Sequence, residues 1–363
     1  MELLDLIFFF PVIIFFLVSA FNYITHPFLY MTNESSEKPK VSLLIPAKNE
    51  INRISKCLES SSNQDYPNIE VIVLDDQSDD GTYEFIQKNF PNIRVVKGKD
   101  RSSGWRGKNW ACQQLSELAN GEILVFTDAD NFFEKDAISK TISKMHNQQL
   151  DFLSIFPQQK NKSISEKIFV PLVDNIVYSL LPLKLTLWLK GHKIAAANGQ
   201  WIAISKIAYQ NIGGHSSVKD QWAEDIQISR IVKKAGYKIL VNSGLNIIYT
   251  RMYDSYQSIK NGFEKNMYYM LGGNFFITTL SAFMYLSTIT VPVYFLYFNK
   301  TNTAIIYLAM LLSWKFFVSA LGGLNYLSSL IYHPIMVLFI FRESFRSMRL
   351  IKSNNVQWKG VGA

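Results

Sequence analysis

The chain has very little cysteine, and this shortage excludes two kinds of scaffold. Cys57 and Cys112 are its two cysteines among 363 residues. A disulfide framework or a structural zinc site would need more thiols, or thiols and histidines at close spacing. Two isolated thiols are typical of a reducing compartment, and we expect each of them to act as a small buried apolar side chain on a helix.

The chain also lacks the basic and aromatic pattern by which proteins recognise nucleic acid, although its formal net charge is +8. Part of this charge lies in the C-terminal tail, which carries Arg342, Arg346, Arg349 and Lys352. Basic residues beside membrane spans favour the cytoplasmic face and anionic lipid headgroups. We therefore expect a membrane partner and no nucleic acid.

One long apolar run opens the chain. The stretch from Leu3 to Ile24 is nearly all apolar, and it is long enough to cross a bilayer core of about 30 Å. It lacks the basic start and the small-residue cleavage site of a signal peptide. Residues 1–25 are therefore predicted to form an uncleaved transmembrane anchor.

Three more apolar runs close the chain, at Phe275–Phe298, Ala304–Gly323 and Leu324–Phe341. They predict a C-terminal transmembrane region at residues 275–342. A basic tail of the cytoplasmic type follows at residues 343–363.

The number of these apolar runs conflicts with the expectation that both the domain and the basic tail are cytoplasmic. One span before a cytoplasmic domain and three after it would place the basic tail outside. Either one C-terminal run is re-entrant or interfacial, or the last two form a hairpin that does not cross. Lys315 and the pair Gly322–Gly323 make Ala304–Gly323 the weakest of the three runs.

The residues between these runs alternate short apolar stretches with amphipathic ones. Such alternation predicts a parallel sheet with helices on both faces. The predicted fold class is therefore α/β, with a Rossmann-like, mostly parallel sheet in a domain at residues 38–250. Strands are predicted at Val41–Pro46, Ile69–Leu74, Ile93–Val96, Ile123–Phe126 and Asp151–Phe156, and helices at Asn52–Ser61, Thr82–Lys88 and Lys108–Leu118.

Two further stretches, residues 163–190 and 251–274, mix apolar residues with groups that argue against a membrane crossing. The first of them contains Pro171, Asp174 and Pro182. A crossing there would also put the two halves of the domain on opposite sides of the membrane. Both stretches are predicted to form helices that lie along the bilayer surface.

Two carboxylates stand just past the end of the strand predicted at Ile123–Phe126. Asp128 and Asp130 are one residue apart, so they can converge on one hard divalent cation. Mg²⁺ and Mn²⁺ prefer oxygen ligands and usually hold a phosphate-bearing substrate as well. Because ligands bind at the carboxyl ends of strands in open α/β sheets, we predict a Mg²⁺ or Mn²⁺ site here.

Polar side chains also follow the first two strands. Pro46 to Glu50 end the first strand, and Asp75 and Asp76 end the second. Loops at neighbouring strand ends share one cleft, so these groups are expected to frame a nucleotide base and its ribose. Asp79 and Asp80 are instead interpreted as caps of the helix that follows.

A lysine flanked by glycine opens the helix predicted at Lys108–Leu118. Lys108 directly follows Gly107, and a lysine at a helix N-terminus is well placed to hold a pyrophosphate through its charge and the free backbone N–H groups. The segment is not a Walker loop, since that spacing of glycines and lysine is absent.

In this order, the motifs resemble those of family 2 glycosyltransferases with a GT-A fold. The resemblance covers roughly residues 41–250, and the ordered set is specific although each piece alone is not. It is carried by Ile45–Glu50, Leu74–Thr82, Gly107–Lys108, Asp128–Asp130, Gly213–His215 and Glu224–Asp225.

The resemblance implies a role for these residues. Asp225 would be the catalytic base with Glu224 beside it, because a hydroxyl acceptor needs a carboxylate within hydrogen-bond reach as it attacks. Without the upstream motifs, both acids would instead be interpreted as favourable negative charges in the first turn of a helix. Asp128 and Asp130 would hold the metal and the diphosphate. The implied nucleotide-sugar contacts are Pro46, Ala47, Glu50, Asp75, Asp76, Lys108, Asp128 and Arg251.

Later segments are similar to those of membrane enzymes that glycosylate carotenoids or related isoprenoid lipids. The chain departs from the processive polysaccharide synthases of the family, because it lacks their Gln-x-x-Arg-Trp motif, and this argues for transfer of a single sugar. Arg251 would take over part of that motif's contact with the diphosphate. The similar segments are 198–201, 213–215, 224–226, 235–237, 250–253 and 356–360, and the implied acceptor-side residues are Gly199, Gln200, Trp201, Gly214 and His215.

The sequence thus predicts an inverting, metal-dependent transfer of one hexose from a nucleotide-diphosphate sugar, with UDP-glucose as the expected donor, to a hydroxyl or carboxylate of a membrane lipid. The protein would be a multi-pass protein of the inner membrane with its catalytic domain in the cytoplasm. The alternatives are a polyprenyl-phosphate glycosyltransferase or glycolipid synthase, and a non-catalytic binding protein of the same fold. A nucleotidyltransferase is disfavoured because no glycine-rich loop follows the first strand.

Overall fold

The computed structural model describes residues 3–25, 27–30, 38–353, 357–358 and 361–362. The chain divides into two compact units, each built from separate stretches. The helical unit comprises Met1–His26, Gln159–Pro182 and Met252–Ala363, and the sheet unit comprises Pro27–Gln158 and Leu183–Arg251.

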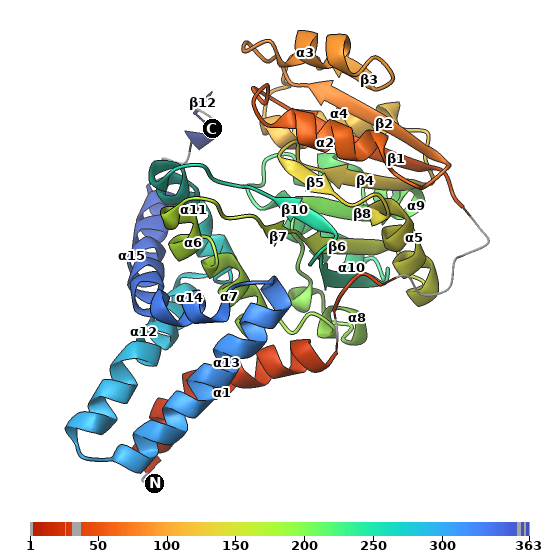
Figure 1. Cartoon of the computed structure of the whole chain (residues 1–363). Coiled ribbons are helices and arrows are strands. Elements are labelled where there is room, and N and C mark those ends of the chain that lie inside the picture. The colour runs from red at the N-terminus through yellow and green to blue at the C-terminus, as the bar shows by residue number, and fades with distance from the viewer. Residues whose placement is uncertain (1–2, 26, 31–37, 354–356, 359–360, 363) are drawn as a thin grey trace. The chain divides into compact units, whose positions relative to one another are not determined.

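Seven strands of the sheet unit form one sheet (Figure 1). They are β1 (Val41–Ala47), β2 (Ile69–Asp75), β3 (Arg94–Lys97), β4 (Ile123–Thr127), β6 (Phe152–Phe156), β8 (Trp201–Ser205) and β9 (Ile239–Ser243). Their order across the sheet is β3-β2-β1-β4-β8-β6-β9. All neighbours are parallel except that β8 runs antiparallel to both β4 and β6.

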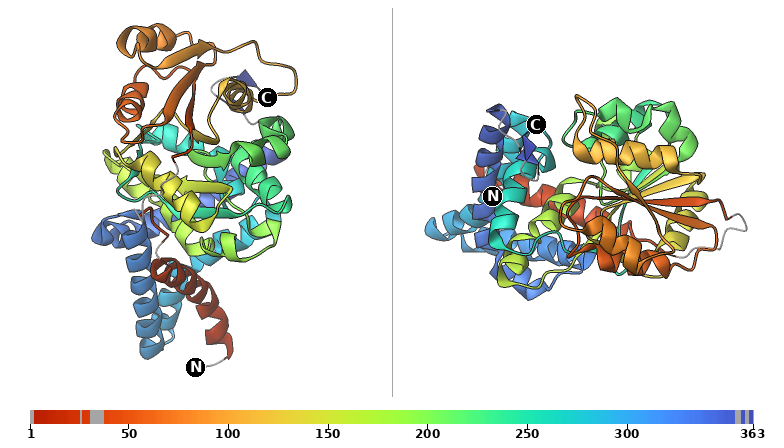
Figure 2. Two further views of the ribbon diagram at one scale, coloured as in Figure 1. Left: turned by 90° about the vertical axis from the view of Figure 1, so that its right-hand side faces the viewer. Right: turned by 90° about the horizontal axis from the view of Figure 1, so that it is seen from above.

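Helices pack on both faces of this sheet (Figure 2), each face over its own buried apolar cluster. Successive side chains of a strand point to opposite faces, so a strand buried on both faces is a continuous apolar run. The predicted α/β fold with a mostly parallel sheet is confirmed. One face carries α2 (Ile54–Ser62), α3 (Thr82–Asn89) and α5 (Ala137–Gln148), and the other α4 (Gly107–Leu118), α9 (Lys206–Asn211) and α10 (Glu224–Lys234).

The antiparallel strand β8 was not among the predicted strands. It is five residues long, and periodicity alone does not distinguish so short an apolar stretch from a buried helix. The chain also contains several shorter strands and helices. These are β5 (Asn131–Phe133), β10 (Ile248–Thr250), β7 (Gln158–Gln159), α8 (Leu185–Trp188), the short helices His192–Ile194 and Gly214–Val218, and the terminal strands β11 (Gln357–Trp358) and β12 (Val361–Gly362).

The helical unit contains α1 (Leu3–Ile24), α6 (Ile164–Phe169), α7 (Leu172–Leu180), α11 (Tyr256–Met270), α12 (Phe275–Tyr297), α13 (Thr301–Gly322), α14 (Tyr326–Ile331) and α15 (His333–Lys352). Among the described residues, α1 (from Asp5), α12 and α13 are long and apolar enough to cross a membrane, by length and composition. The start of α1 lies beside the loop between α12 and α13, where Lys300 Nζ and Asp5 Oδ1 are 2.8 Å apart.

The structure corrects the expectation about which C-terminal run is weakest. α13 is continuous despite Lys315, and it ends in a left-handed cap at Gly323. The run at Leu324–Phe341 is instead broken into α14 and α15. A new helix begins at His333 with Pro334 in its first turn, because proline lacks an N–H and is tolerated there but not inside a helix.

Within residues 163–190, which were predicted to lie along the bilayer surface, α7 differs from the expectation. Gln159–Pro182 belongs to the helical unit and Leu183 onward to the sheet unit, which corrects the expected placement of all of residues 163–190 in the sheet domain. Every residue of α7 from Leu172 to Ser179 is buried. A surface-lying helix would leave one face uncovered, so α7 is an interior helix of its unit.

Candidate active site

The carboxyl ends of β1, β2 and β4 lie together at one edge of the sheet. Ala47 at the end of β1 pairs with Asp75 at the end of β2. The next residue, Asp76, donates its backbone N–H to the carbonyl of Ala47 over 2.7 Å. The structure therefore brings together Ala47, Asp75 and Asp76, three of the residues expected at the nucleoside.

The two aspartates at the end of β2 have different surroundings. Asp75 Oδ2 accepts the backbone N–H of Ser78 over 3.1 Å, and its Oδ1 is buried without a described hydrogen-bond partner. Asp76 lies 3.7 Å from Lys48 Nζ. Burial nevertheless raises the pKa of Asp76. An unpaired buried acceptor such as Asp75 Oδ1 suits a ligand hydroxyl or N–H donor.

Asp80 closes the loop after β2, whereas the N-cap residue of α3 is Gly81 and not Asp79 or Asp80, which corrects their interpretation as caps. Its carboxylate accepts the backbone N–H groups of Thr82 over 2.9 Å and of Ile51 over 3.2 Å. The backbone N–H of Glu50 in turn donates to Thr82 Oγ1 over 2.9 Å. These bonds hold the loop that carries the half-buried Glu50 against the start of α3.

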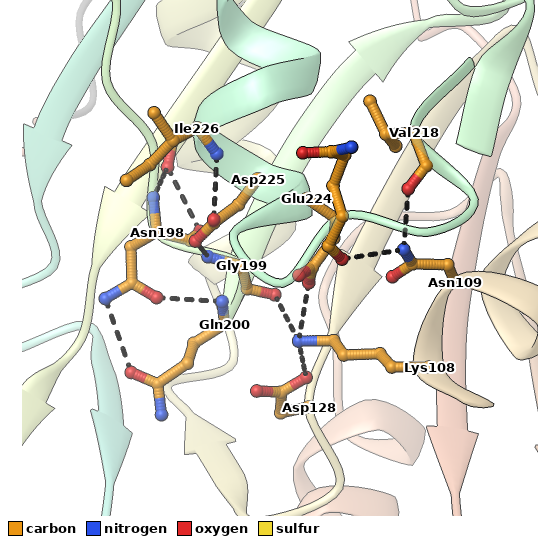
Figure 3. Close-up of polar contacts among 12 residues, drawn as sticks. Lys108, Asn109, Asp128, Asn198, Gly199, Gln200, Val218, Glu224, Asp225 and Ile226 are labelled. Atoms are coloured by element: carbon orange, nitrogen blue, oxygen red, sulfur yellow. Dashed lines mark hydrogen bonds and ion pairs between the residues drawn. The ribbon is translucent and has the colours of Figure 1, made fainter. Parts of the chain in front are cut away.

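Lys108 lies in the first turn of α4 and contacts residues from three other segments (Figure 3). Its Nζ is 2.8 Å from Asp128 Oδ1, 3.5 Å from Glu224 Oε1 and 3.5 Å from the carbonyl oxygen of Gly199. Burial lowers the pKa of Lys108, but the charges of Asp128 and Glu224 outweigh it and raise that pKa above its usual value. The amine is therefore a permanent positive charge at the centre of the site.

Asp128 and Asp130 follow β4, and they fit a hard divalent cation. Asp130 Oδ1 is buried without a described hydrogen-bond partner. Burial, reinforced by the charges of Asp128 and Glu50, raises the pKa of Asp130 to about 7, so the site is short of positive charge. The described residues contain no cluster of three or more side chains that could hold a metal. Beyond these two carboxylates, ligands would come from a bound diphosphate and water.

Glu224 and Asp225 form the first turn of α10, where the free backbone N–H groups favour negative charge. Asp225 Oδ2 accepts the backbone N–H of Gly199 over 2.7 Å, and its Oδ1 accepts that of Ile226 over 2.8 Å. Burial raises the pKa of Glu224 to about 7 and also raises the pKa of Asp225. The carboxylate expected to act as base is thus fixed in orientation and raised in basicity.

Gly199 approaches all three charged groups closely. A Cβ atom on Gly199 would lie 3.1 Å from Lys108 Nζ, 3.3 Å from Glu224 Oε1 and 3.4 Å from Asp225 Oδ2. The neighbouring Gln200 is buried, and its side chain donates to Thr250 Oγ1 over 3.2 Å. Gly199 therefore belongs to the charged site, whereas the contacts of Gln200 are structural.

Two of the expected acceptor-side residues shape a wall of the pocket that Lys108, Glu224 and Asp225 line. His215 lines this pocket, and its Nδ1 lies 2.7 Å from the hydroxyl of Tyr209. Burial lowers the pKa of His215 to about 3, so the ring is neutral at pH 7. A Cβ on Gly214 would lie 2.5 Å from the Tyr209 ring, and glycine also permits the positive φ of 56° found there.

The placement of Trp201 differs from the expectation. Its side chain is fully buried and packs on Phe133, with ring centroids 5.0 Å apart. Successive residues of β8 face opposite sides of the sheet, so Ile202 lines the pocket while Trp201 points into the opposite core. The ring of Trp201 is a side chain of the hydrophobic core.

Arg251 is half-buried and directly follows β10. It is the last residue of the sheet unit, and its expected contact with the diphosphate stays a prediction. The similarity at residues 356–360 falls largely outside the described residues, which include only Gln357–Trp358 of that segment.

Sequence reasoning missed two buried asparagines of the site. Asn131 Nδ2 donates to Thr127 Oγ1 over 3.0 Å and to the carbonyl of Gln200 over 2.5 Å, which fixes the loop that carries Asp128 and Asp130. Asn109, next to Lys108, is also buried. Its place in the first turn of α4 gave no signal, because asparagine is common at helix starts.

Comparison with known proteins agrees with this geometry. Residues 42–213 match the family model of Glycosyl transferase family 2. The 4,4'-diaponeurosporenoate glycosyltransferase of Staphylococcus aureus (strain USA300) is 29% identical over 241 residues, which cover 64% of this chain and 62% of the relative. The chain therefore matches less than two thirds of that relative's length.

A solved structure has a similar fold. The mannosyltransferase of Pyrobaculum calidifontis, determined in complex with GDP-Man and Mn²⁺, aligns with a TM-score of 0.60 at 16% identity and covers 94% of this chain and 95% of its own. This likeness confirms the expected GT-A type of fold. The match to the model of Glycosyl transferase family 2 extends over residues 42–213, most of which lie in the sheet unit.

Proposed function

We propose that the protein transfers a single hexose from a nucleotide-diphosphate sugar to a membrane lipid, with inversion at the anomeric carbon. The observation that carries this proposal is the position of Lys108, whose Nζ lies 2.8 Å from Asp128 and 3.5 Å from Glu224. One positive charge therefore stands between the carboxylates expected to hold the donor and those expected to activate the acceptor. A transferase needs both sets of groups close to the same reacting centre.

Asp225 is proposed to be the catalytic base. Its carboxylate would take the proton of an acceptor hydroxyl while the acceptor oxygen forms a bond to the anomeric carbon of the sugar. The bond from that carbon to the phosphate oxygen breaks in the same step, and the nucleoside diphosphate leaves. The hydrogen bonds from the backbone N–H groups of Gly199 and Ile226 would hold the carboxylate in place for this attack.

The leaving diphosphate needs positive charge. Lys108 would supply part of it, because its amine is already charged and lies at the N-terminus of α4. Asp128 and Asp130 would hold Mg²⁺ or Mn²⁺, which would neutralise more of the charge on the diphosphate. The ion pair between Lys108 and Asp128 would be exchanged for contacts with the bound donor.

The acceptor is proposed to be a carotenoid or another isoprenoid lipid, and the donor UDP-glucose. The relative from Staphylococcus aureus, named as a diaponeurosporenoate glycosyltransferase, supports the acceptor class. The apolar helices of the helical unit would give the chain access to membrane lipids. A polyprenyl phosphate is the second acceptor class to be tested, since no described residue of the site distinguishes a lipid hydroxyl from a lipid phosphate.

We further propose that α1, α12 and α13 each cross the membrane and that the sheet unit is cytoplasmic. Three crossings would remove the conflict that four apolar runs created, because the basic residues of α15 would then lie on the same side as the sheet unit. The ion pair between Asp5 and Lys300 agrees with this arrangement, since both residues would lie at the outer ends of their helices.

The test is a donor and acceptor scan with the full-length protein in detergent. UDP- and GDP-sugars are supplied with Mn²⁺ and a lipid extract, and products are sought by mass spectrometry. The proposal expects a hexose-mass increase on an isoprenoid lipid. An increase only on polyprenyl phosphate would support the second acceptor class, and no transfer from any donor would refute the proposal.

A further inference from the structure

The segment Val218–Trp222 leads directly into the two carboxylates at the start of α10. Asn109 in the first turn of α4 holds three carbonyl groups of this segment. Its side-chain Nδ2 lies 2.8 Å from the oxygen of Val218, 3.3 Å from that of Lys219 and 3.2 Å from that of Gln221. The first of these contacts is drawn in Figure 3.

Arg106, which precedes Lys108 in the sequence, contacts the same segment. Its backbone N–H donates to the carbonyl of Lys219 over 2.9 Å, and its Nε donates to the carbonyl of Asp220 over 2.7 Å. The guanidinium group also stacks on the ring of Trp222, 3.6 Å from the ring centroid. Every residue from Val218 to Trp222 thus contacts Arg106 or Asn109.

These contacts connect the start of α4, which carries the donor-side residue Lys108, with the segment that precedes the carboxylates Glu224 and Asp225. Lys108 lies between Arg106 and Asn109 in the chain, and its amine contacts Asp128 on the donor side. Asn109 is buried, so its amide has no water to replace a lost carbonyl partner. A shift of the segment would move Glu224 and Asp225 relative to Lys108, and small displacements of catalytic groups lower rates steeply.

We propose that Asn109 and Arg106 are positioning residues that fix Val218–Trp222, so that the catalytic carboxylates keep their place relative to the donor-binding lysine. This inference rests on the proposed function of Lys108, Glu224 and Asp225. It predicts that loss of either residue lowers the turnover rate while the donor, held by α4 and by the end of β4, still binds.

The test compares Asn109→Ala and Arg106→Ala with Gln113→Ala, whose side chain bonds Glu117 on the same helix. For the first two variants we expect kcat to fall at least about 10-fold, with the KM of the donor changed less than about 2-fold. The control should retain the wild-type kcat. A parallel loss of kcat and donor affinity in all three variants would overturn the proposal.

A second measurement does not depend on activity. Hydrogen exchange of the amides at residues 218–222 should speed up in Asn109→Ala and Arg106→Ala and stay unchanged in Gln113→Ala. Arg106→Lys keeps the charge but loses the planar stack and the Nε donor, so it should behave like Arg106→Ala. Unchanged exchange in Arg106→Ala would overturn the inference even if the wild type transfers sugar. Faster exchange would support the connection even if the transfer assay fails.

Discussion

At the scale of single residues, Lys108 is the group on which the site depends. The sequence predicted Lys108 and Asp128 from their places at a helix start and a strand end, whereas Glu224 and Asp225 were expected only through the resemblance to the family. The contact partners of Asn109 and Asn131 were not predictable, since their carbonyl acceptors lie far away in the sequence. Trp201 was misplaced because a motif does not reveal which face of a strand a side chain occupies.

Gly199→Ala should damage the site with little effect on the fold. The new Cβ would lie 3.1 Å from Lys108 Nζ and 3.3 Å from Glu224 Oε1, and both atoms end flexible side chains that can move away. We expect kcat to fall about 10-fold or more, because the charged groups are displaced, and the melting temperature to stay within about 3 °C.

Gly191→Ala is the matched control, because a Cβ there would meet nothing within 4 Å. It should leave both the turnover rate and the melting temperature unchanged. An active Gly199→Ala enzyme would show that the spacing between Lys108 and Glu224 is not needed for catalysis.

The buried Glu224 gives stability a specific pH dependence. Burial raises its pKa from 4.5 to about 7 in the folded protein, so the folded state binds a proton more tightly than the unfolded state does. The stability that the folded state gains by binding a proton at Glu224 is present in full below pH 4.5. It is lost as the pH rises to about 7. Glu224→Gln should therefore gain stability relative to wild type over this range, by on the order of 2 kcal/mol.

The measurement is the difference in unfolding free energy between wild type and Glu224→Gln, taken at several pH values without donor or metal. Taking the difference removes the contribution of titrating groups that do not interact with Glu224. A difference that does not change with pH, or that shrinks as the pH rises, would contradict a raised pKa.

At the scale of elements, the sheet was predictable and the helical unit only in part. Strands β1, β2 and β4 are buried apolar runs that end in polar residues, so their positions can be read from the sequence. α7 was misjudged because its apolar composition is the same for a surface helix and an interior one. Its burial depends on packing against α1 and α13, which contribute residues from distant parts of the chain.

One hydrogen bond pairs a buried polar side chain of α7 with a buried charged side chain of α13. Lys315 in α13 is fully buried, and its Nζ donates to Asn175 Oδ1 in α7 over 2.7 Å. Asn175→Ala would leave the amine without this acceptor, and we expect a loss of about 1–3 kcal/mol of stability. Thermal unfolding in detergent measures it.

Two further variants make this test specific to the pair. Asn175→Asp keeps an oxygen for Lys315 and should retain most of the stability. Asn302→Ala, at an exposed position in the first turn of α13, should have no effect. Equal stability of Asn175→Ala and Asn302→Ala would show that the contact between Lys315 and Asn175 contributes nothing.

At the scale of the whole molecule, the number of membrane crossings was the least predictable property. Hydropathy gave four apolar runs, and it did not reveal that Pro334 and the charges of α15 exclude the last one from the candidate spans. Three crossings would place the loop between α12 and α13 outside and the end of α15 inside.

Labelling of single cysteines tests this arrangement. Cys57 and Cys112 are buried, so they should not react. Asn302→Cys should react with an impermeant maleimide in intact cells, whereas Ser353→Cys should react only after the membrane is permeabilised. The opposite pattern would place the sheet unit outside, and labelling of both positions from one side would contradict the single crossing by α13 that lies between them.

The most direct test of the account measures the release of nucleoside diphosphate together with the formation of glycosylated lipid. It compares wild type, Asp225→Asn and the exposed-site control Glu59→Gln, each with Mn²⁺. We expect equal amounts of both products from wild type and the control, and a loss of at least about 100-fold in Asp225→Asn. Full activity of Asp225→Asn would contradict its role as the base, and absence of both products from wild type would contradict the proposed transfer itself.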